Sequence, residues 1–267
     1  MILQQFPELS HGNKKEHKFY PFISEKLEKF SDSVVDSYAK QFPQCSTVDK
    51  KLQTQKTVIT YDASAAYSIP SFKSAENIKR FYKYLGISPR KLLFISMVCP
   101  NTLRVPSCFY YSLGYMVHMS KQDNKPLDVK LTKLNLWLSS VLKYPYSKYW
   151  NSGGALRANC LWWGIYDKIF EKYINAFPES RFFMIDSYYA FSNQQKLADS
   201  LSLEFKVPSR NISCHHSNKS QHKEELTAEL KAQLKSFFAN PEQKFKEMIK
   251  HKDNIKTFPC QSFGNNW

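Results

Sequence analysis

Glycine is scarce in this chain, with 7 residues among 267. No glycine-rich segment of the kind whose backbone amides cradle phosphates occurs. No apolar run approaches the ~18–20 residues that a membrane-spanning helix needs. The N-terminus also lacks the pattern of a signal peptide. We therefore expect no membrane anchor within these residues and no phosphate loop of the glycine-rich type.

Metal-binding cysteine patterns are missing as well. None of the six cysteines forms a CxxC pair, so we expect no zinc or other metal site. The cysteines are too few for a fold built on disulfides, although a single Cys214–Cys260 bridge is an option that spacing alone does not decide. Three histidines (His215, His216 and His222) share an irregular stretch, where solvated loop histidines are a better interpretation than metal ligands.

Positive charge is abundant: 38 Lys and Arg against 23 Asp and Glu give a net charge of +15. Such an excess favours anionic partners, among them nucleotides, acidic glycans, nucleic acid and acidic membranes. The lysines are spread along the chain and no nucleic-acid motif is present, so we expect no nucleic-acid partner.

The order of elements predicts an α/β fold with a parallel sheet flanked by helices. Residues 56–61 and 92–98 form strands on either side of a helix at 74–85 that Gly86 ends, and 181–185 form a further buried strand. We interpret residues 1–267 as one domain. The other helices are predicted at 25–42, 107–120, 127–142, 161–177, 193–201 and 226–249, while 1–11 indicate a helix end and 252–267 show no period.

One stretch, Pro89–Tyr111, carries the strongest hint of a binding site. Its apolar run at 92–98 resembles a strand buried on both faces. The segment after it resembles the first turn of a helix, with Pro106 at the first helical position. Arg104 and Ser107 are three residues apart and share a face. A cation and a hydroxyl at a helix N-terminus predict a phosphate site. The alternative is a helix cap with a surface arginine.

Several segments together resemble the sulfotransferase domain of the glycosaminoglycan enzymes, especially the heparan sulfate N- and 3-O-sulfotransferases. The likeness spans nearly the whole chain, and the order of the motifs is more specific than any one of them. The matching segments are Phe6–Ser10, Glu16–Tyr20, Tyr38–Pro43, Asp62–Tyr67, Lys91–Ser107, Gly164–Tyr166, Phe177–Asp186 and Leu226–Ile249.

The resemblance implies a function and a set of site residues. The family transfers a sulfuryl group from PAPS to a hydroxyl or amine of a carbohydrate, so its partners are a nucleotide donor and an acidic or neutral glycan acceptor. Glu16 takes the place of the family's base, and Arg104 and Ser107 take that of its 3′-phosphate contacts. The remaining nucleotide-binding residues implied are Gly164, Tyr166, Lys219 and His222. Family membership also implies the Golgi lumen.

Two departures from the family pattern bear on catalysis. The family's "K-x-G-T-T" loop, which holds the 5′-phosphosulfate, is absent, so we expect a P-loop-NTPase-like sulfotransferase fold missing its first strand and loop. The lysine of the family's "E-K-S" motif is replaced by Ala63, which removes a cation near the transferring group. A catalytically inactive relative that binds nucleotide or acidic glycan is therefore the alternative function, and a basic scaffold that binds neither is the third hypothesis.

Overall fold

The structure is a computed structural model that describes residues 2–6, 9–11, 31–42, 59–62, 73–123, 132–143, 160–212 and 224–259. The chain divides into two compact units, which are described separately. The first comprises Met1–Phe94, Asn175–Arg181 and Tyr189–His215, and the second comprises Ile95–Ile174, Phe182–Tyr188 and His216–Trp267. The single-domain prediction stays a prediction.

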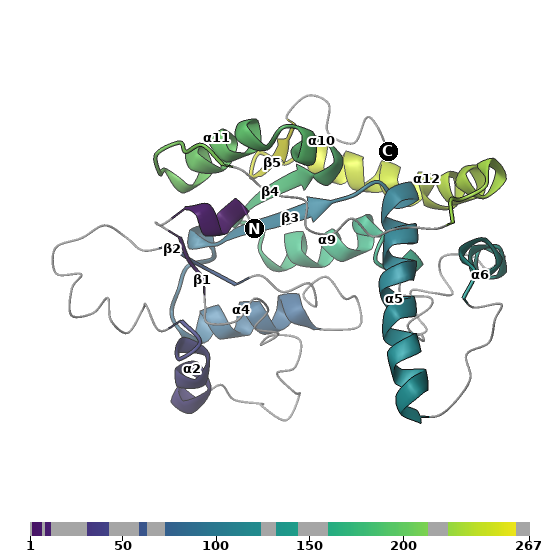
Figure 1. Ribbon diagram of the computed structural model, residues 1–267. Coiled ribbons are helices and arrows are strands. Elements are labelled where there is room, and N and C mark those ends of the chain that lie inside the picture. The colour runs from purple at the N-terminus through teal and green to yellow at the C-terminus, as the bar shows by residue number, and fades with distance from the viewer. Residues whose placement is uncertain are drawn as a thin grey trace. The chain divides into compact units, whose positions relative to one another are not determined.

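The first unit contains a two-stranded parallel sheet in which Leu9 pairs with Ile59 and His11 with Tyr61. The helix that follows buries Ala75, Ile78 and Phe81 on one face, and Gly86 beyond its end has a φ of +65°, which glycine adopts without strain. The elements, labelled in Figure 1, are η1 (Ile2–Gln5), β1 (Leu9–His11), α2 (Asp32–Ala39), β2 (Ile59–Tyr61), α4 (Ser74–Tyr84), η3 (Pro89–Lys91) and α11 (Gln194–Phe205).

A three-stranded sheet with the order β3-β4-β5 has most of its residues in the second unit. Its strands β4 and β5 are parallel, with Phe182 opposite Ile255. The strands are β3 (Leu93–Val98), β4 (Arg181–Asp186) and β5 (Ile255–Phe258), and the helices that follow or precede them are α5 (Asn101–Asp123), α6 (Leu134–Val141), α9 (Tyr166–Ala176), α10 (Ser187–Ser192) and α12 (Ala228–Lys250). The predicted α/β class with a parallel sheet is confirmed.

Short strands account for most of what the sequence patterns missed. Strands β1 and β5 were not predicted, because three or four residues are too few to show an alternating pattern. Strand β3 was predicted to be buried on both faces, but only Val98 is fully buried and Met97 is 53% exposed. By contrast, β4 is buried from Phe182 to Asp186, as its apolar run predicts.

Two of the predicted helices, at 161–177 and 127–142, differ from the structure at their starts. The helix predicted at 161–177 is interrupted: residues 160–162 are helical, the chain turns at Trp163 and Gly164, and α9 begins at Tyr166. Residues 127–131 of the helix predicted at 127–142 lie outside the described residues, and α6 begins at Leu134. The carboxylate of Glu224 accepts the backbone N–H groups of Leu134 (2.9 Å) and Asn135 (3.3 Å), and so caps the start of α6.

Helix α5 corrects the prediction for the candidate site. It begins at Asn101, because the carbonyl of Pro100 accepts the N–H groups of Leu103 (3.0 Å) and Arg104 (2.9 Å). Pro106 therefore lies inside the helix and not at its first position. Figure 1 shows α5 starting where β3 ends. Arg104 thus belongs to the first turn of a long helix, directly after a strand.

The core of the second unit joins α5, α6 and α12. Side chains from all three helices and from the segment before α9 form one buried cluster: Val105, Cys108, Phe109, Leu134, Trp137, Leu138, Cys160, Leu161, Trp162, Ile165, Leu226, Leu230, Leu234 and Phe238. The ring centroids of Phe109 and Trp137 are 5.0 Å apart, so the aromatic faces of α5 and α6 are in contact.

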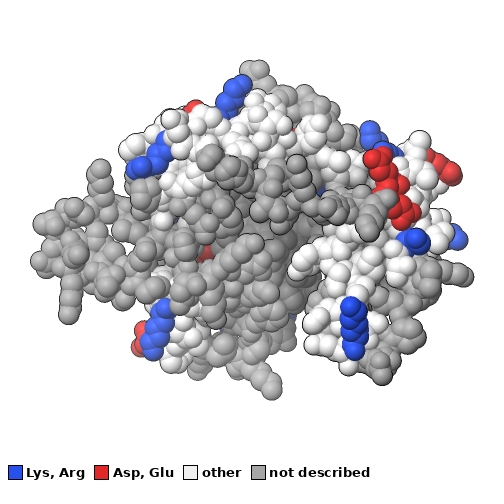
Figure 2. Space-filling model, in the orientation of Figure 1, with Lys and Arg blue, Asp and Glu red and all other residues white. Residues whose placement is uncertain are grey.

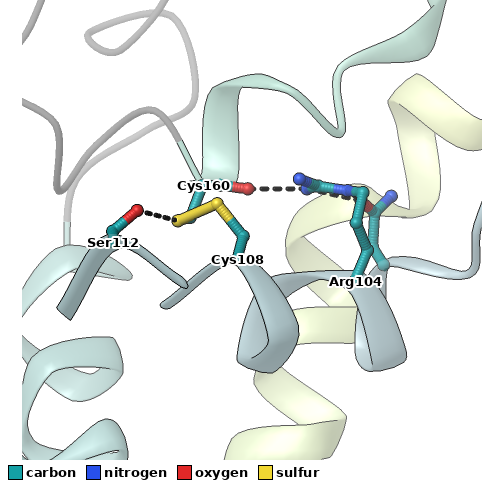
Figure 3. Close-up of a disulfide and its surroundings, with 5 residues drawn as sticks. Arg104, Cys108, Ser112 and Cys160 are labelled. Carbon is teal, nitrogen blue, oxygen red and sulfur yellow. Dashed lines mark hydrogen bonds between the residues drawn. A yellow bond between two sulfur atoms is a disulfide. The ribbon is translucent and has the colours of Figure 1, made fainter. Parts of the chain in front are cut away.

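A disulfide between Cys108 and Cys160 crosses this core (Figure 3). It links α5 to the segment that precedes α9, across 52 residues of sequence. The Ser112 hydroxyl, one turn further along α5, lies 3.7 Å from the Cys160 sulfur and donates to it, because a disulfide sulfur carries no proton. The sequence did not predict this pairing, and Cys214 and Cys260 lie outside the described residues.

We expect the Cys108→Ala/Cys160→Ala double variant to be less stable than the wild type by about 2–4 kcal/mol, because a cross-link closing a loop of this length restricts the unfolded chain. Urea unfolding of both proteins measures the difference. Dithiothreitol should lower the midpoint of the wild type more than that of the double variant. A double variant as stable as the wild type would show that the bridge contributes nothing to the fold.

Candidate functional site

The C-terminal end of β3 is held by a tyrosine from α9. The Tyr166 hydroxyl donates to the carbonyl of Cys99 (2.8 Å) and accepts from the N–H of the same residue (3.2 Å). Burial raises the pKa of Tyr166 to about 12, so the hydroxyl keeps its proton at neutral pH. Tyr166 therefore fixes the backbone from which α5 starts.

Asn101, the first residue of α5, connects three parts of the second unit. Its Nδ2 donates to the carbonyl of Gly164 (3.3 Å) and to Oε1 of Glu242 on α12 (2.7 Å). Its Oδ1 accepts from Nε (3.0 Å) and Nη2 (2.9 Å) of Arg104. All the polar atoms of this buried amide are thus engaged.

The Arg104 guanidinium is enclosed by these neighbours. Besides its two bonds to Asn101, Nη2 donates to the carbonyl of Cys160 (2.6 Å), as Figure 3 shows. Burial lowers the pKa of Arg104, and the nearby Tyr166, Cys99 and Glu242 partly oppose that shift. The third nitrogen, Nη1, is buried and has no hydrogen-bond partner among the residues that the structure describes. A buried cationic donor without an acceptor costs free energy, so an acceptor is expected at this position.

Gly164 lies against the two side chains of this network. A Cβ at this position would overlap Asn101 Oδ1 and Arg104 Nη2. Only glycine therefore lets the turn before α9 approach the amide and the guanidinium this closely. The requirement for glycine here is one of space.

Ser107 lies one turn after Arg104 on α5 and is exposed. Its neighbours at helical spacing, Leu103 and Tyr111, are 50% and 77% exposed. The three residues form one exposed strip of the helix because they are four apart. Ser107 therefore lies beside the Arg104 network without being part of it.

The structure thus brings together three of the predicted site residues: Arg104, Gly164 and Tyr166. Three more predicted site residues, Glu16, Lys219 and His222, lie outside the described residues, and so does Ala63. The assignment of roles to all of them stays a prediction.

Sequence reasoning missed Asn101 and Glu242. A signal for Glu242 existed: it stands four residues after Phe238 and three before Phe245, on the apolar stripe of α12. A carboxylate in a row of buried aromatic residues needs a polar partner. No local sequence pattern identifies that partner, because Asn101 is 141 residues away from Glu242 in the sequence.

The surface charge is dispersed on the face shown in Figure 2, where the described Lys and Arg side chains stand singly. Within the described ranges, no group of three or more His, Cys, Asp or Glu side chains is arranged to hold a metal ion. None of the helices that the structure describes is long and apolar enough to cross a bilayer.

Comparisons with known proteins bear on the fold. No protein-family model and no curated protein matches the chain. Among solved structures, a sulfotransferase from Alicyclobacillus acidocaldarius matches with a TM-score of 0.55 and 15% identity, over 94% of this chain and 89% of that one. The chain therefore has the fold of a sulfotransferase, as a helix-rich α/β protein with a parallel sheet.

The close approach of Gly164 makes a testable pair of substitutions. We expect Gly164→Ala to lower the free energy of unfolding by about 1–3 kcal/mol, because the new methyl group must push aside two hydrogen-bonded side chains. Gly114→Ala is the control: it lies within α5 with open space around it, and should raise stability by about 0.5–1 kcal/mol. Chemical denaturation of both variants measures the two changes. Equal effects would contradict the packing described for Gly164.

Proposed function

We propose that this protein transfers a sulfuryl group from PAPS to a hydroxyl or amine of a carbohydrate acceptor of the glycosaminoglycan type. The fold it shares with a sulfotransferase supports sulfuryl transfer in general. The observation that carries the proposal to this chain is the buried Nη1 of Arg104, in the first turn of α5, which has no acceptor among the residues that the structure describes.

The residues at the start of α5 fit the 3′-phosphate of such a donor. The N-terminus of a helix of this length favours negative charge through its free amides and its dipole. Arg104 adds a cationic nitrogen, Nη1, that has no partner in the described part of the chain, and Ser107 adds an exposed hydroxyl one turn later. Because Nη1 is enclosed, a phosphate oxygen reaches it only when the atoms that cover it move aside.

PAPS, when bound, supplies a sulfuryl group on a phosphate leaving group. Glu16 is proposed as the base that takes the proton of the acceptor hydroxyl or amine. Tyr166 and Gly164 hold the turn against which Arg104 packs. Lys219 and His222 are proposed to contact the nucleotide, with their charge and hydrogen bonds directed at its phosphates.

A second function shares the same site without the chemistry. Because Ala63 replaces the family's lysine and no Gly-Lys loop is present in the sequence, a relative that binds nucleotide or acidic glycan without turnover is the alternative. The two differ in one measurable respect, which is transfer of sulfate to an acceptor.

The Cys108–Cys160 bridge supports an oxidising location for either function. Disulfides persist in the secretory pathway and are rare in the cytosol. A Golgi lumenal protein is the proposal consistent with this bridge and with the family resemblance.

Binding of PAP, the desulfated nucleotide, tests the phosphate site. We expect Arg104→Ala to weaken binding by about 1.5–3 kcal/mol, the range for a hydrogen bond to a charged group. Ser107→Ala should weaken it by about 0.5–1.5 kcal/mol without affecting stability, since the side chain is exposed. Calorimetry measures both affinities. Ser236→Ala, an exposed serine within α12, is the matched control and should change nothing. A wild-type protein that does not bind PAP refutes the proposed function.

Turnover tests the role of Glu16. We expect Glu16→Gln to abolish transfer of radiolabelled sulfate to a desulfated glycan while PAP affinity is unchanged, because the amide cannot accept the proton. Full activity in this variant would rule out Glu16 as the base. Wild-type protein that binds PAP without transferring sulfate would favour the inactive relative.

A further inference from the structure

Glu242 is a carboxylate on the inner side of α12, between Phe238 and Phe245 in the same stripe. Burial raises the pKa of Glu242, with Asn101, Lys246 and Arg104 opposing the shift. Its short bond from Asn101 Nδ2, at 2.7 Å, is the contact that offsets the loss of water around the carboxylate. The proposed reaction assigns no role to this group.

The Glu242 contact determines which way the Asn101 amide points. A carboxylate only accepts hydrogen bonds, and so does the Gly164 carbonyl. Both face Nδ2 of Asn101. The amide oxygen must therefore face the other way, toward Arg104, whose guanidinium only donates. Reversing the amide would break all four contacts at once.

The amide orientation in turn selects one arrangement of the guanidinium. Asn101 Oδ1 accepts hydrogen bonds from both Nε and Nη2 of Arg104. The Cys160 carbonyl accepts a second hydrogen bond from Nη2. Nη1 is the nitrogen left without a partner within the described part of the chain. A long, flexible side chain held in this way has already lost the rotational freedom that anion binding would otherwise remove.

We propose that Glu242 and Asn101 are positioning residues that orient the Arg104 guanidinium for an anion, so that Nη1 is the nitrogen that bonds to a phosphate oxygen once the atoms covering it move aside. The nature of the anion rests on the proposed function, whereas the orientation of the guanidinium does not. Glu242 acts on the anion only through Asn101 and Arg104.

Replacing Glu242 in two ways separates its hydrogen bond from its charge. Glu242→Leu removes the acceptor and should weaken PAP affinity roughly three- to tenfold. Glu242→Gln keeps an oxygen that can accept from Asn101, so PAP affinity should stay within about twofold of wild type or improve, since a negative charge near the anion is lost. Glu247→Leu is the matched control: this exposed carboxylate on α12 accepts from Gln243 Nε2 in the same way (2.9 Å) and should not weaken binding.

Double variants test whether Glu242 acts through Arg104. In an Arg104→Lys background, which keeps the charge and loses the fork, Glu242→Leu should cause no further loss of PAP affinity. In a Ser107→Ala background, Glu242→Leu should again cause the full loss of PAP affinity, because Ser107 is an exposed residue one turn beyond Arg104. Equal losses in all backgrounds, or a Glu242→Gln variant as weak as Glu242→Leu, would overturn the proposal.

A readout without nucleotide keeps the two proposals apart. The Nε–H of Arg104, bonded to Asn101, can be followed by NMR hydrogen exchange in the free protein. We expect Glu242→Leu to accelerate that exchange roughly tenfold and Glu242→Gln to leave it near wild type. If the wild type fails to bind PAP, the proposed function is refuted, and unchanged Nε–H exchange in Glu242→Leu would separately refute the positioning role.

Discussion

The hydrogen bonds that a partly buried arginine makes at the start of α5 link several segments of the second unit of this protein. The Arg104 guanidinium donates to Asn101 Oδ1 and to the carbonyl of Cys160, and so joins the end of β3 to the segment that leads into α9. A charge taken out of water needs its donors met by acceptors, and two of its three nitrogens have them. The turn before α9, the glycine at 164 and the disulfide beside it all lie next to these contacts.

Covalent and packing constraints support the same contact from three sides. The Cys108–Cys160 bridge ties the residue that offers its carbonyl to Arg104 to the helix that carries Arg104. Tyr166 holds the backbone of Cys99 on the other side. Gly164 allows the chain between them to approach without a steric clash. Together these contacts restrict the guanidinium, which is what the proposed anion site requires.

The sequence pattern and the structure agree on the fold, which is α/β with a parallel sheet. The order of strands and helices is enough to give an α/β protein with a parallel sheet, and β4 was recognised from its apolar run alone. The sequence singled out Arg104 as a phosphate contact at a helix start, with a surface arginine as the alternative, and its role stays a prediction. The structure places it inside a network of buried polar groups, with Pro106 in the body of the helix and Asn101 at its first residue.

Sequence alone therefore determined the elements whose signals are local: apolar runs for the long strands, the helical stripe of α12, and Gly86 at a helix end with positive φ. Only the tertiary structure decided the pairings between distant residues. The bond from Asn101 to Glu242 spans 141 residues and the bridge from Cys108 to Cys160 spans 52. Neither pairing produces a periodic pattern in the sequence, because each involves single residues that do not recur at a regular spacing. Their meeting depends on how the helices pack, which is a property of the whole core.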